Sequence, residues 1–225
     1  MDALRLPDLV ATPARRQRAI LSRLSGPGPV ARLLEGLLAD EAAVLRVARM
    51  SYRHPLGFDK YVLWCRHPAG RLHMHVWWPD AHHEREHIHN HRFAFSSAVV
   101  AGVVRSALFE RSETGRPYDR FTDSTPLHAD GWRLERRDTV VVARSATLEV
   151  CAGSAYSQAA STLHRVEVTA GPAVTLFLEG PVTRSHSEVL IEPGQRPPGR
   201  LRRTPFTPDE LRERLTLVGE TLLGP

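Results

Sequence analysis

The sequence predicts an all-β fold, a barrel with helices at both ends of the chain. Two observations lead to this prediction. From Phe58 onward, short segments alternate polar and apolar side chains with a period of two, and turn residues separate most of them. No helical pattern lies between these segments, which favours a sandwich or barrel over alternating strands and helices.

Length and composition suit one domain with an appended segment. The chain has 225 residues, 42% of them hydrophobic and 24% charged, which is enough to bury a core without disulfide bonds. We place an N-terminal helical segment at residues 1–50 and the barrel at 51–192. A linker rich in proline and arginine and a final helix follow at 193–225.

Three helices are expected before the barrel. Thr12 can cap the first, with Pro13 at its first position, and Asp40 can cap the third, which runs to about Met50. An apolar stripe at helical spacing indicates the middle helix. Its residues are Val30, Leu33, Leu34, Leu37 and Leu38.

The final helix has the clearest local signals. Thr207 and Glu210 have the spacing of a capping box, and Phe206 and Leu211 can form its hydrophobic staple. The apolar face is Leu211, Leu215, Val218 and Leu222. The expected strands of the barrel are 58–66, 72–78, 88–95, 98–110, 139–143, 147–151, 164–169, 174–179 and 187–191.

Charge and apolar patterning argue against nucleic-acid and membrane partners. The net charge is +5, but the basic residues are scattered, and Lys60 is the only lysine among the 30. The apolar runs are too short to span a membrane, and no signal sequence begins the chain, so we expect a cytoplasmic protein. Cys65 and Cys151 are expected in its core. The oligomeric state stays open between a monomer and a homodimer.

Histidine is the informative residue type, because seven of the 12 histidines fall between His73 and His91. On a strand, His89 and His91 project from one face, so both imidazoles can reach one ion. A third ligand must come from a neighbouring strand, and His164 opens a later strand. Three imidazoles buried together without an ion or an acidic partner would be costly, which favours a metal site.

The segment 89–95, followed by six residues and Gly102, resembles the first cupin motif, in which HxH precedes a glutamate and a glycine. Phe95 stands at the glutamate position, and of the second cupin motif only His164 is matched. Because it lacks the glutamate, the segment resembles the cysteine-dioxygenase-like branch of the cupins, whose iron is held by three histidines. Residues 88–91 resemble the ligand strand of that branch, and the resemblance extends over about 58–181.

The resemblance implies a mononuclear non-haem Fe(II) dioxygenase that binds a small, polar, anionic metabolite and O2 at positions opposite the three histidines. Zinc, manganese and nickel also suit these ligands. Two alternatives stay open. One is a non-redox isomerase, lyase or hydrolase that uses the ion as a Lewis acid, and the other is a ligand-binding cupin without chemistry.

The same resemblance assigns residues to the substrate pocket. Lys60 stands where the family presents an arginine to the substrate carboxylate, and Glu179 stands in the strand that carries the family's Ser-His-Tyr triad. Facing inward, Lys60 would bind a carboxylate, and Glu179 would bind an amine or move a proton. The alternative for both is solvent exposure. Tyr156 is a further catalytic candidate, and no cysteine lies near His91 to form the family's thioether crosslink.

A rival motif overlaps the histidine cluster. The segment 83–87 matches HExxH, in which His83 and His87 bind zinc on a helix and Glu84 acts as the base. Residues 80–87 have no apolar helical face, so we predict a polar loop at the barrel mouth instead.

The remaining candidates have plainer interpretations. His73 and His75 share a face with Trp77 and are expected as a surface or mouth-lining pair, with orientation of the metal ligands as the alternative. Arg92 alternates to the face opposite the ligands and is expected to pack outside. Four isolated histidines are expected to be structural or solvent-exposed: His54, His67, His128 and His186.

Overall fold

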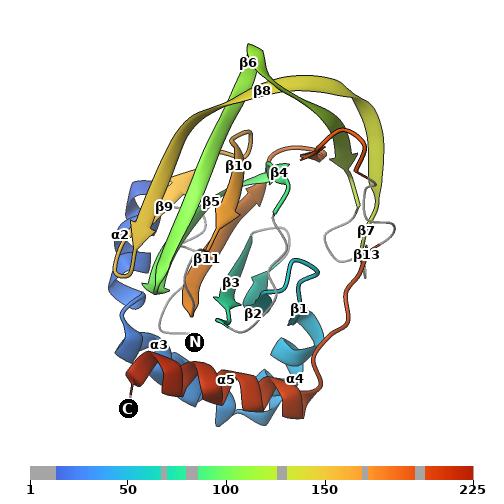
Figure 1. The fold of residues 1–225 in the computed structure, drawn as a ribbon. Coiled ribbons are helices and arrows are strands. Elements are labelled where there is room, and N and C mark those ends of the chain that lie inside the picture. The colour runs from blue at the N-terminus through green and yellow to red at the C-terminus, as the bar shows by residue number, and fades with distance from the viewer. Residues whose placement is uncertain are drawn as a thin grey trace.

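A computed structural model describes residues 14–66, 70–79, 86–125, 131–168, 172–195 and 201–224, apart from the side chains of residues 201 and 202. These residues form two large β-sheets, one two-stranded sheet and four helices (Figure 1). The predicted predominance of β-structure, with helices at both ends of the chain, is confirmed. No helix in this part of the chain is long and apolar enough to cross a membrane.

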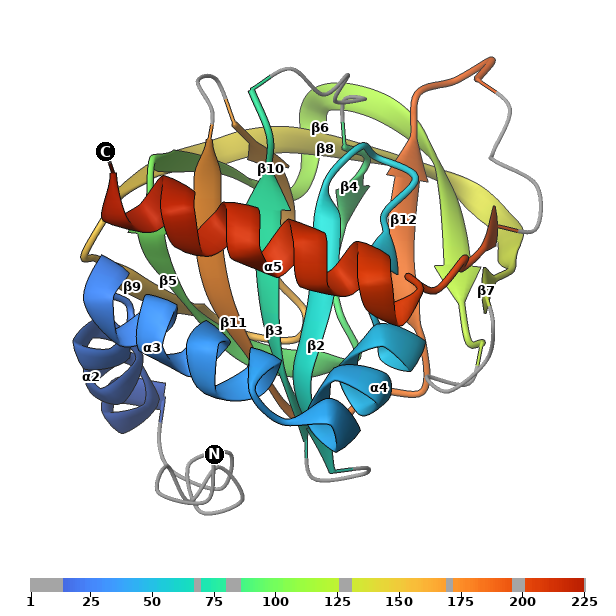
Figure 2. The same ribbon diagram turned by 90° about the horizontal axis from the view of Figure 1, so that it is seen from below.

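The four helices lie on the outer face of one sheet (Figure 2). They are α2 (Ala14–Leu24), α3 (Pro27–Leu38), α4 (Glu41–Met50) and α5 (Pro208–Leu223). The Asp40 side chain accepts a hydrogen bond from the Ala43 amide at 3.1 Å, which confirms the cap of α4. Thr207 and Glu210 form the predicted capping box of α5. Thr12 and Pro13 lie outside the described residues.

The sheet beneath these helices has six strands in the order β1, β2, β3, β11, β5, β9, and all neighbours are antiparallel. Their bounds are β1 Tyr52–Arg53, β2 Asp59–Arg66, β3 Gly70–Trp77, β11 Ala173–Val182, β5 Phe93–Ala101 and β9 Ala155–Gln158. Apolar side chains on its outer face, such as Met74 and Leu176, pack with helix residues such as Leu34 and Leu215 into the largest core cluster.

The second sheet is built around the long strands β6 (Val103–Asp123) and β8 (Leu134–Cys151), which pair along most of their length. The early part of β6 pairs with β10 (Leu163–Glu167), and its end pairs with β12 (Ser187–Ile191). The short strand β4 (Ile88–His89) lies between β10 and β12. β7 (Gly131–Trp132) and β13 (Leu201–Arg202) form the separate two-stranded sheet.

The predicted strand at 88–95 is interrupted. β4 ends at His89 and β5 begins at Phe93, because residues 90–92 carry the chain from one large sheet to the other. The amide of Asn90 bonds to the Glu188 carbonyl at 3.0 Å, and the amide of His91 to the Ala160 carbonyl at 3.1 Å. The two strands predicted at 139–143 and 147–151 are instead parts of the single strand β8.

The cysteines correct a second prediction. Cys65 and Cys151 are exposed free thiols rather than core residues. Cys65 lies next to the end of β2, where the last residues of the strand are exposed, and Cys151 ends β8 on the exposed side of the strand, directly after the buried Val150.

Candidate metal centre

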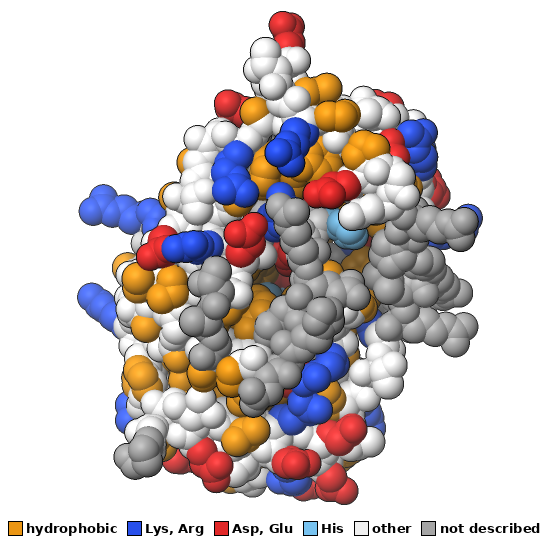
Figure 3. Space-filling model, in the orientation of Figure 1, with side chains coloured by type: hydrophobic (Ala, Val, Ile, Leu, Met, Phe, Trp, Pro, Cys, Tyr) orange, Lys and Arg blue, Asp and Glu red, His pale blue; other side chains and the backbone are white. Residues whose placement is uncertain are grey.

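A cavity of about 1210 Å³ lies between the two large sheets, and strands of both sheets line it. Its walls combine aromatic rings with ionisable side chains, among them His89 and His164 from one sheet and Lys60 and Glu179 from the other. Figure 3 shows histidine within a hollow of the surface, with basic and acidic side chains around it. Concave sites with a few convergent polar groups are the usual places for small ligands.

The three predicted metal ligands meet in this cavity. His89 on β4 and His164 on β10 are direct register partners, and His91 follows two residues after His89. One nitrogen of each imidazole lies within 4.8 Å of the others. The ring centroids are 4.5 Å apart for His89 and His164, 4.9 Å for His89 and His91, and 5.1 Å for His91 and His164.

Backbone hydrogen bonds orient two of the three rings. His89 Nδ1 lies 3.0 Å from the carbonyl oxygen of His87, and His164 Nδ1 lies 3.1 Å from that of Thr162. A carbonyl oxygen only accepts, so Nδ1 carries the proton in both rings and Nε2 keeps a free lone pair. This arrangement is typical of metal-binding histidines, whose second nitrogen is held by an outer partner.

The protonation of the ligands also suits a metal. Burial lowers the pKa of His164 to about 3 and that of His91 well below its usual value. Both imidazoles are therefore neutral at pH 7, the form that binds a metal ion. The donor set and its orientation fit a divalent ion held by three nitrogens.

An aromatic wall closes one side of the three histidines. The ring of Phe95 lies 5.1 Å from that of His91 and 5.7 Å from that of His164, and it stacks on Phe177 at 4.4 Å. Phe95 is the residue at the glutamate position of the cupin motif. It fills that place with an apolar ring, so the ligand group found among the described residues contains no carboxylate.

Glu86 is a further neighbour of this site, and its sequence position alone does not mark it as one. Its Oε2 accepts a hydrogen bond from the Val166 amide at 2.7 Å and lies 4.0 Å from His89 Nδ1. Burial raises the pKa of Glu86. In the sequence it is one unremarked position of HExxH, and only the pairing of β4 with β10 brings it to Val166.

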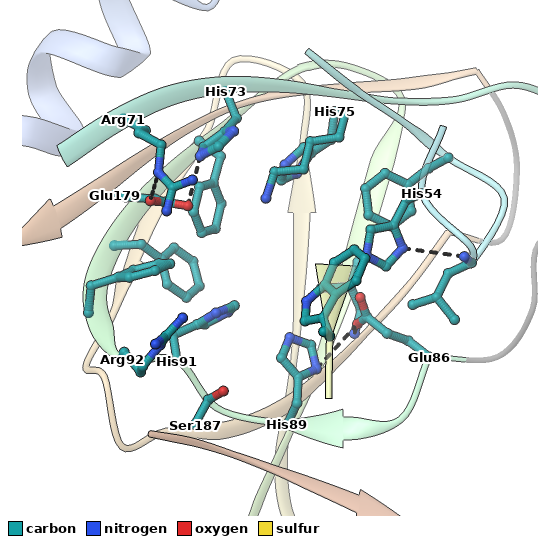
Figure 4. Close-up of a pocket in the computed structure, with 18 of the residues that line it drawn as sticks. His54, Arg71, His73, His75, Glu86, His89, His91, Arg92, Glu179 and Ser187 are labelled. Atoms are coloured by element: carbon teal, nitrogen blue, oxygen red, sulfur yellow. Dashed lines mark hydrogen bonds and ion pairs between the residues drawn. The ribbon is translucent and has the colours of Figure 1, made fainter. Parts of the chain in front are cut away.

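Facing the three histidines, a buried polar cluster occupies the six-stranded sheet (Figure 4). Glu179 is only 4% exposed, and its two oxygens are both engaged. Oε2 accepts from Arg71 Nε at 2.8 Å, and Oε1 accepts from His73 Nε2 at 2.7 Å. Burial raises the pKa of Glu179, but His73 and Arg71 outweigh it and lower this pKa to about 2. Burial lowers the pKa of His73 to about 4, so a neutral imidazole donates to a carboxylate at pH 7.

Lys60 and Tyr156 also line the cavity. Burial lowers the pKa of Lys60 to about 8. Burial raises the pKa of Tyr156 to about 12, so its hydroxyl keeps the proton at neutral pH.

The structure corrects the predictions for His73, His75 and Arg92. His73 and His75 lie inside the cavity rather than at the surface, because β3 lies between β2 and β11 and presents alternate side chains to the interior. Arg92 also lines the cavity, since the chain turns at 90–92 and the strand alternation stops there. His54 is a cavity residue that stacks on Phe58 at 4.4 Å.

The rival HExxH motif lies mostly outside the described residues, which exclude His83 and Glu84, as they do His67 and His128. The two described positions, Glu86 and His87, precede β4 in a non-helical conformation. His186, half-buried, is hydrogen-bonded to Ser185 at 3.1 Å.

No protein-family model and no curated protein matches the chain. Among solved structures it is similar to hydroquinone 1,2-dioxygenase PnpCD in complex with Cd2+ and 4-hydroxybenzonitrile, with a TM-score of 0.34 and 15% identity over 61% of this chain and 70% of that one. A PAC13 variant from Streptomyces with uridine gives 0.33 and 13% over 73% and 92%. A cupin-like protein from Thermotoga maritima gives 0.28 and 12% over 72% and 90%. None of these likenesses is close enough to indicate a function.

Proposed function

We propose that the protein is a cupin-type enzyme, a mononuclear non-haem Fe(II) dioxygenase of the three-histidine kind that acts on a small, polar, anionic metabolite. One observation carries the proposal. Three imidazoles converge inside a cavity of about 1210 Å³, and backbone carbonyl oxygens engage Nδ1 of two of them and leave Nε2 for a metal. A site built this way has the ligands for one metal ion and the space for a substrate beside it.

His89, His91 and His164 would hold the metal. When bound, Fe(II) would supply positions for substrate and O2 together with the electrons that oxygen chemistry needs. Three neutral ligands leave the charge of the ion uncompensated, which favours an anionic substrate. The rings of Phe95 and Phe177 exclude water from one side of this centre.

Lys60, Tyr156 and Glu179 would each have a different role in the pocket. Lys60 would contact an anionic group of the substrate from the six-stranded sheet, and Tyr156 would donate a hydrogen bond from its protonated hydroxyl. Glu179 was expected to bind an amine or move a proton. Because Arg71 and His73 already engage both its oxygens, the geometry favours a positioning role in which Glu179 orients these two side chains.

The test is metal analysis followed by oxygen consumption. Protein purified without oxygen should carry one iron per chain, and a panel of small anionic metabolites should include one that makes it consume O2. The variants His89→Ala and His91→Ala should bind little metal and should consume no O2. Product formation without O2 uptake would instead establish the non-redox isomerase, lyase or hydrolase. Ligand binding without any product would establish a binding protein.

A further inference from the structure

Lys60 is the only lysine of the chain, and it lies in the cavity wall. It belongs to β2, where it is the register partner of His75 on β3, and Thr175 of β11 is the next residue in the same row. His89 and His164 line the cavity from the other large sheet. The one ε-amino group of the protein is therefore placed in the space that faces the candidate metal centre.

This amine has no hydrogen bond or salt bridge within the part of the chain that the structure describes. The nearby carboxylate, Glu179, is bonded to Arg71 and His73 through both of its oxygens. Lys60 and Arg71 are thus both near the carboxylate of Glu179, and Arg71 has the direct contact. The ammonium form of Lys60 is left without a counterion of its own, which disfavours that form at a half-buried position inside a cavity.

The charges around Lys60 act on its pKa in both directions, and burial has the largest effect. Burial lowers the pKa of Lys60 to about 8; Glu179 opposes this shift, while Arg71 and Arg203 add to it. The histidines around it carry little charge at pH 7, because burial lowers the pKa of each: His54, His73, His75 and His91. At pH 7 about a tenth of Lys60 is then unprotonated, compared with less than about a thousandth of an ordinary lysine.

We propose that Lys60 is a covalent attachment site for a small aldehyde or ketone, which it binds as an imine. The nitrogen lone pair of the free amine adds to the carbonyl carbon and forms the C–N bond. The carbonyl oxygen then leaves as water, taking up the two protons that the nitrogen gives up. The step needs no oxidant or reductant, and it goes beyond the proposed dioxygenase because it does not involve the metal.

His75 is placed to assist these proton transfers. Its Nε2 is buried and has no hydrogen-bond partner among the described residues, and His75 stands directly beside Lys60 across the β2–β3 pair. An imidazole with a free nitrogen can accept a proton from the adding amine and return one to the departing oxygen. The positive side chain of Arg92 also lines the cavity, which favours a carbonyl compound that bears a carboxylate.

The experiment uses glyoxylate, a small anionic aldehyde, with cyanoborohydride to reduce any imine to a stable secondary amine. An Arg105→Lys variant supplies a matched control, because position 105 is exposed on β6 and does not line the cavity. Both lysines are then followed in the same molecule by peptide mass mapping at pH 7. We expect Lys60 to be modified at least about tenfold faster than the engineered lysine, since far more of it is unprotonated.

Further measurements make the result decisive. The rate at Lys60 should rise with pH to a midpoint near its pKa of about 8, and His75→Gln should slow it while Lys60 stays in place. Chelator treatment should leave the rate unchanged, so this result and the metal test can fail separately. Modification of Lys60 no faster than that of the exposed lysine would overturn the proposal.

Discussion

His89 and His164 are directly opposite each other in the pairing of β4 with β10, and each donates its Nδ1 proton to the carbonyl two residues before it. The two rings therefore reach the cavity in the same manner from adjacent antiparallel strands. With both Nδ1 atoms committed, the only lone pairs left to these imidazoles are on Nε2. Both imidazoles are therefore oriented as metal ligands would be.

The first prediction concerns metal content. Replacing His91 or His164 by alanine should reduce the bound metal from one ion per chain to near zero, because two imidazoles are a poor site for a divalent ion. The circular dichroism spectrum should stay unchanged, since the largest core cluster lies on the other face of the six-stranded sheet. His186→Ala is the control and should keep its metal, because His186 does not line the cavity. Full occupancy in either ligand variant, measured by mass spectrometry of the metal, would remove that residue from the site.

The second prediction concerns the Glu179 cluster and acid. Glu179→Gln should lower the free energy of unfolding at neutral pH by about 3 kcal/mol, because it leaves the largely buried Arg71 without its carboxylate. The pKa of Glu179 is about 2 in the folded chain, below its usual 4.5, so its stabilising effect is complete above pH 4.5 and is lost as the pH falls towards 2. The difference between wild type and variant should therefore shrink over that range.

Urea unfolding of both proteins from about pH 7 to about pH 3 measures this difference. Glu149→Gln is the matched control, since Glu149 forms an ion pair with Arg105 in which both side chains are about half exposed. Its effect should stay below about 1 kcal/mol at neutral pH. A difference for Glu179→Gln that stayed constant down to the lowest pH would show that the ionised carboxylate is not what stabilises the fold.

Prediction from the sequence is most accurate for features that depend on residues close together in the chain. The cap of α5 depends on Thr207 and Glu210, three residues apart, and both were identified. His89 and His91 were identified from their spacing on one expected strand, although β4 ends at His89 and His91 lies in the turn that follows. Arg71 and Glu179 are 108 residues apart, and only the pairing of β3 with β11 joins them.

The histidines of β3 were assigned to the surface or to the barrel mouth for a related reason. Alternation of polar and apolar residues in a strand usually indicates one wet and one buried face. Here the outer face of the sheet is covered by helices and the inner face borders the cavity, so His73 and His75 are polar without facing bulk solvent. A period of two shows which residues share a face, but it does not show whether that face borders solvent or a cavity.

The third prediction concerns how α5 is attached to the sheet. Asp59 is fully buried at the start of β2, and its carboxylate accepts hydrogen bonds from four side chains. They are Arg53 at 2.9 Å, Tyr61 at 3.0 Å, Trp78 at 2.8 Å and Arg214 of α5 at 2.9 Å. Asp59→Asn should destabilise the protein by about 3 kcal/mol, because an amide cannot accept all four bonds and leaves buried donors unpaired.

Thermal and urea unfolding measure this effect. Glu213→Gln, at an exposed position of α5, is the control and should change the stability by less than about 0.5 kcal/mol. Arg214→Met should cost less than Asp59→Asn, because three donors still reach the carboxylate. Equal stability of Asp59→Asn and wild type would mean that apolar packing alone holds α5 in place.

The last prediction concerns Gly102, the glycine of the motif that follows the two histidines. It joins β5 to β6 with φ of 74°, and a Cβ atom there would lie 2.6 Å from the carbonyl oxygen of Pro172. Gly153 has a similar φ of 83°, but nothing lies within 4 Å of its Cβ position. Gly153→Ala should therefore show only the backbone cost of about 1 kcal/mol, and Gly102→Ala should cost about 3 kcal/mol or more. Urea unfolding of the two variants separates backbone strain from steric conflict, and equal losses would show that the chain near Pro172 moves aside without cost.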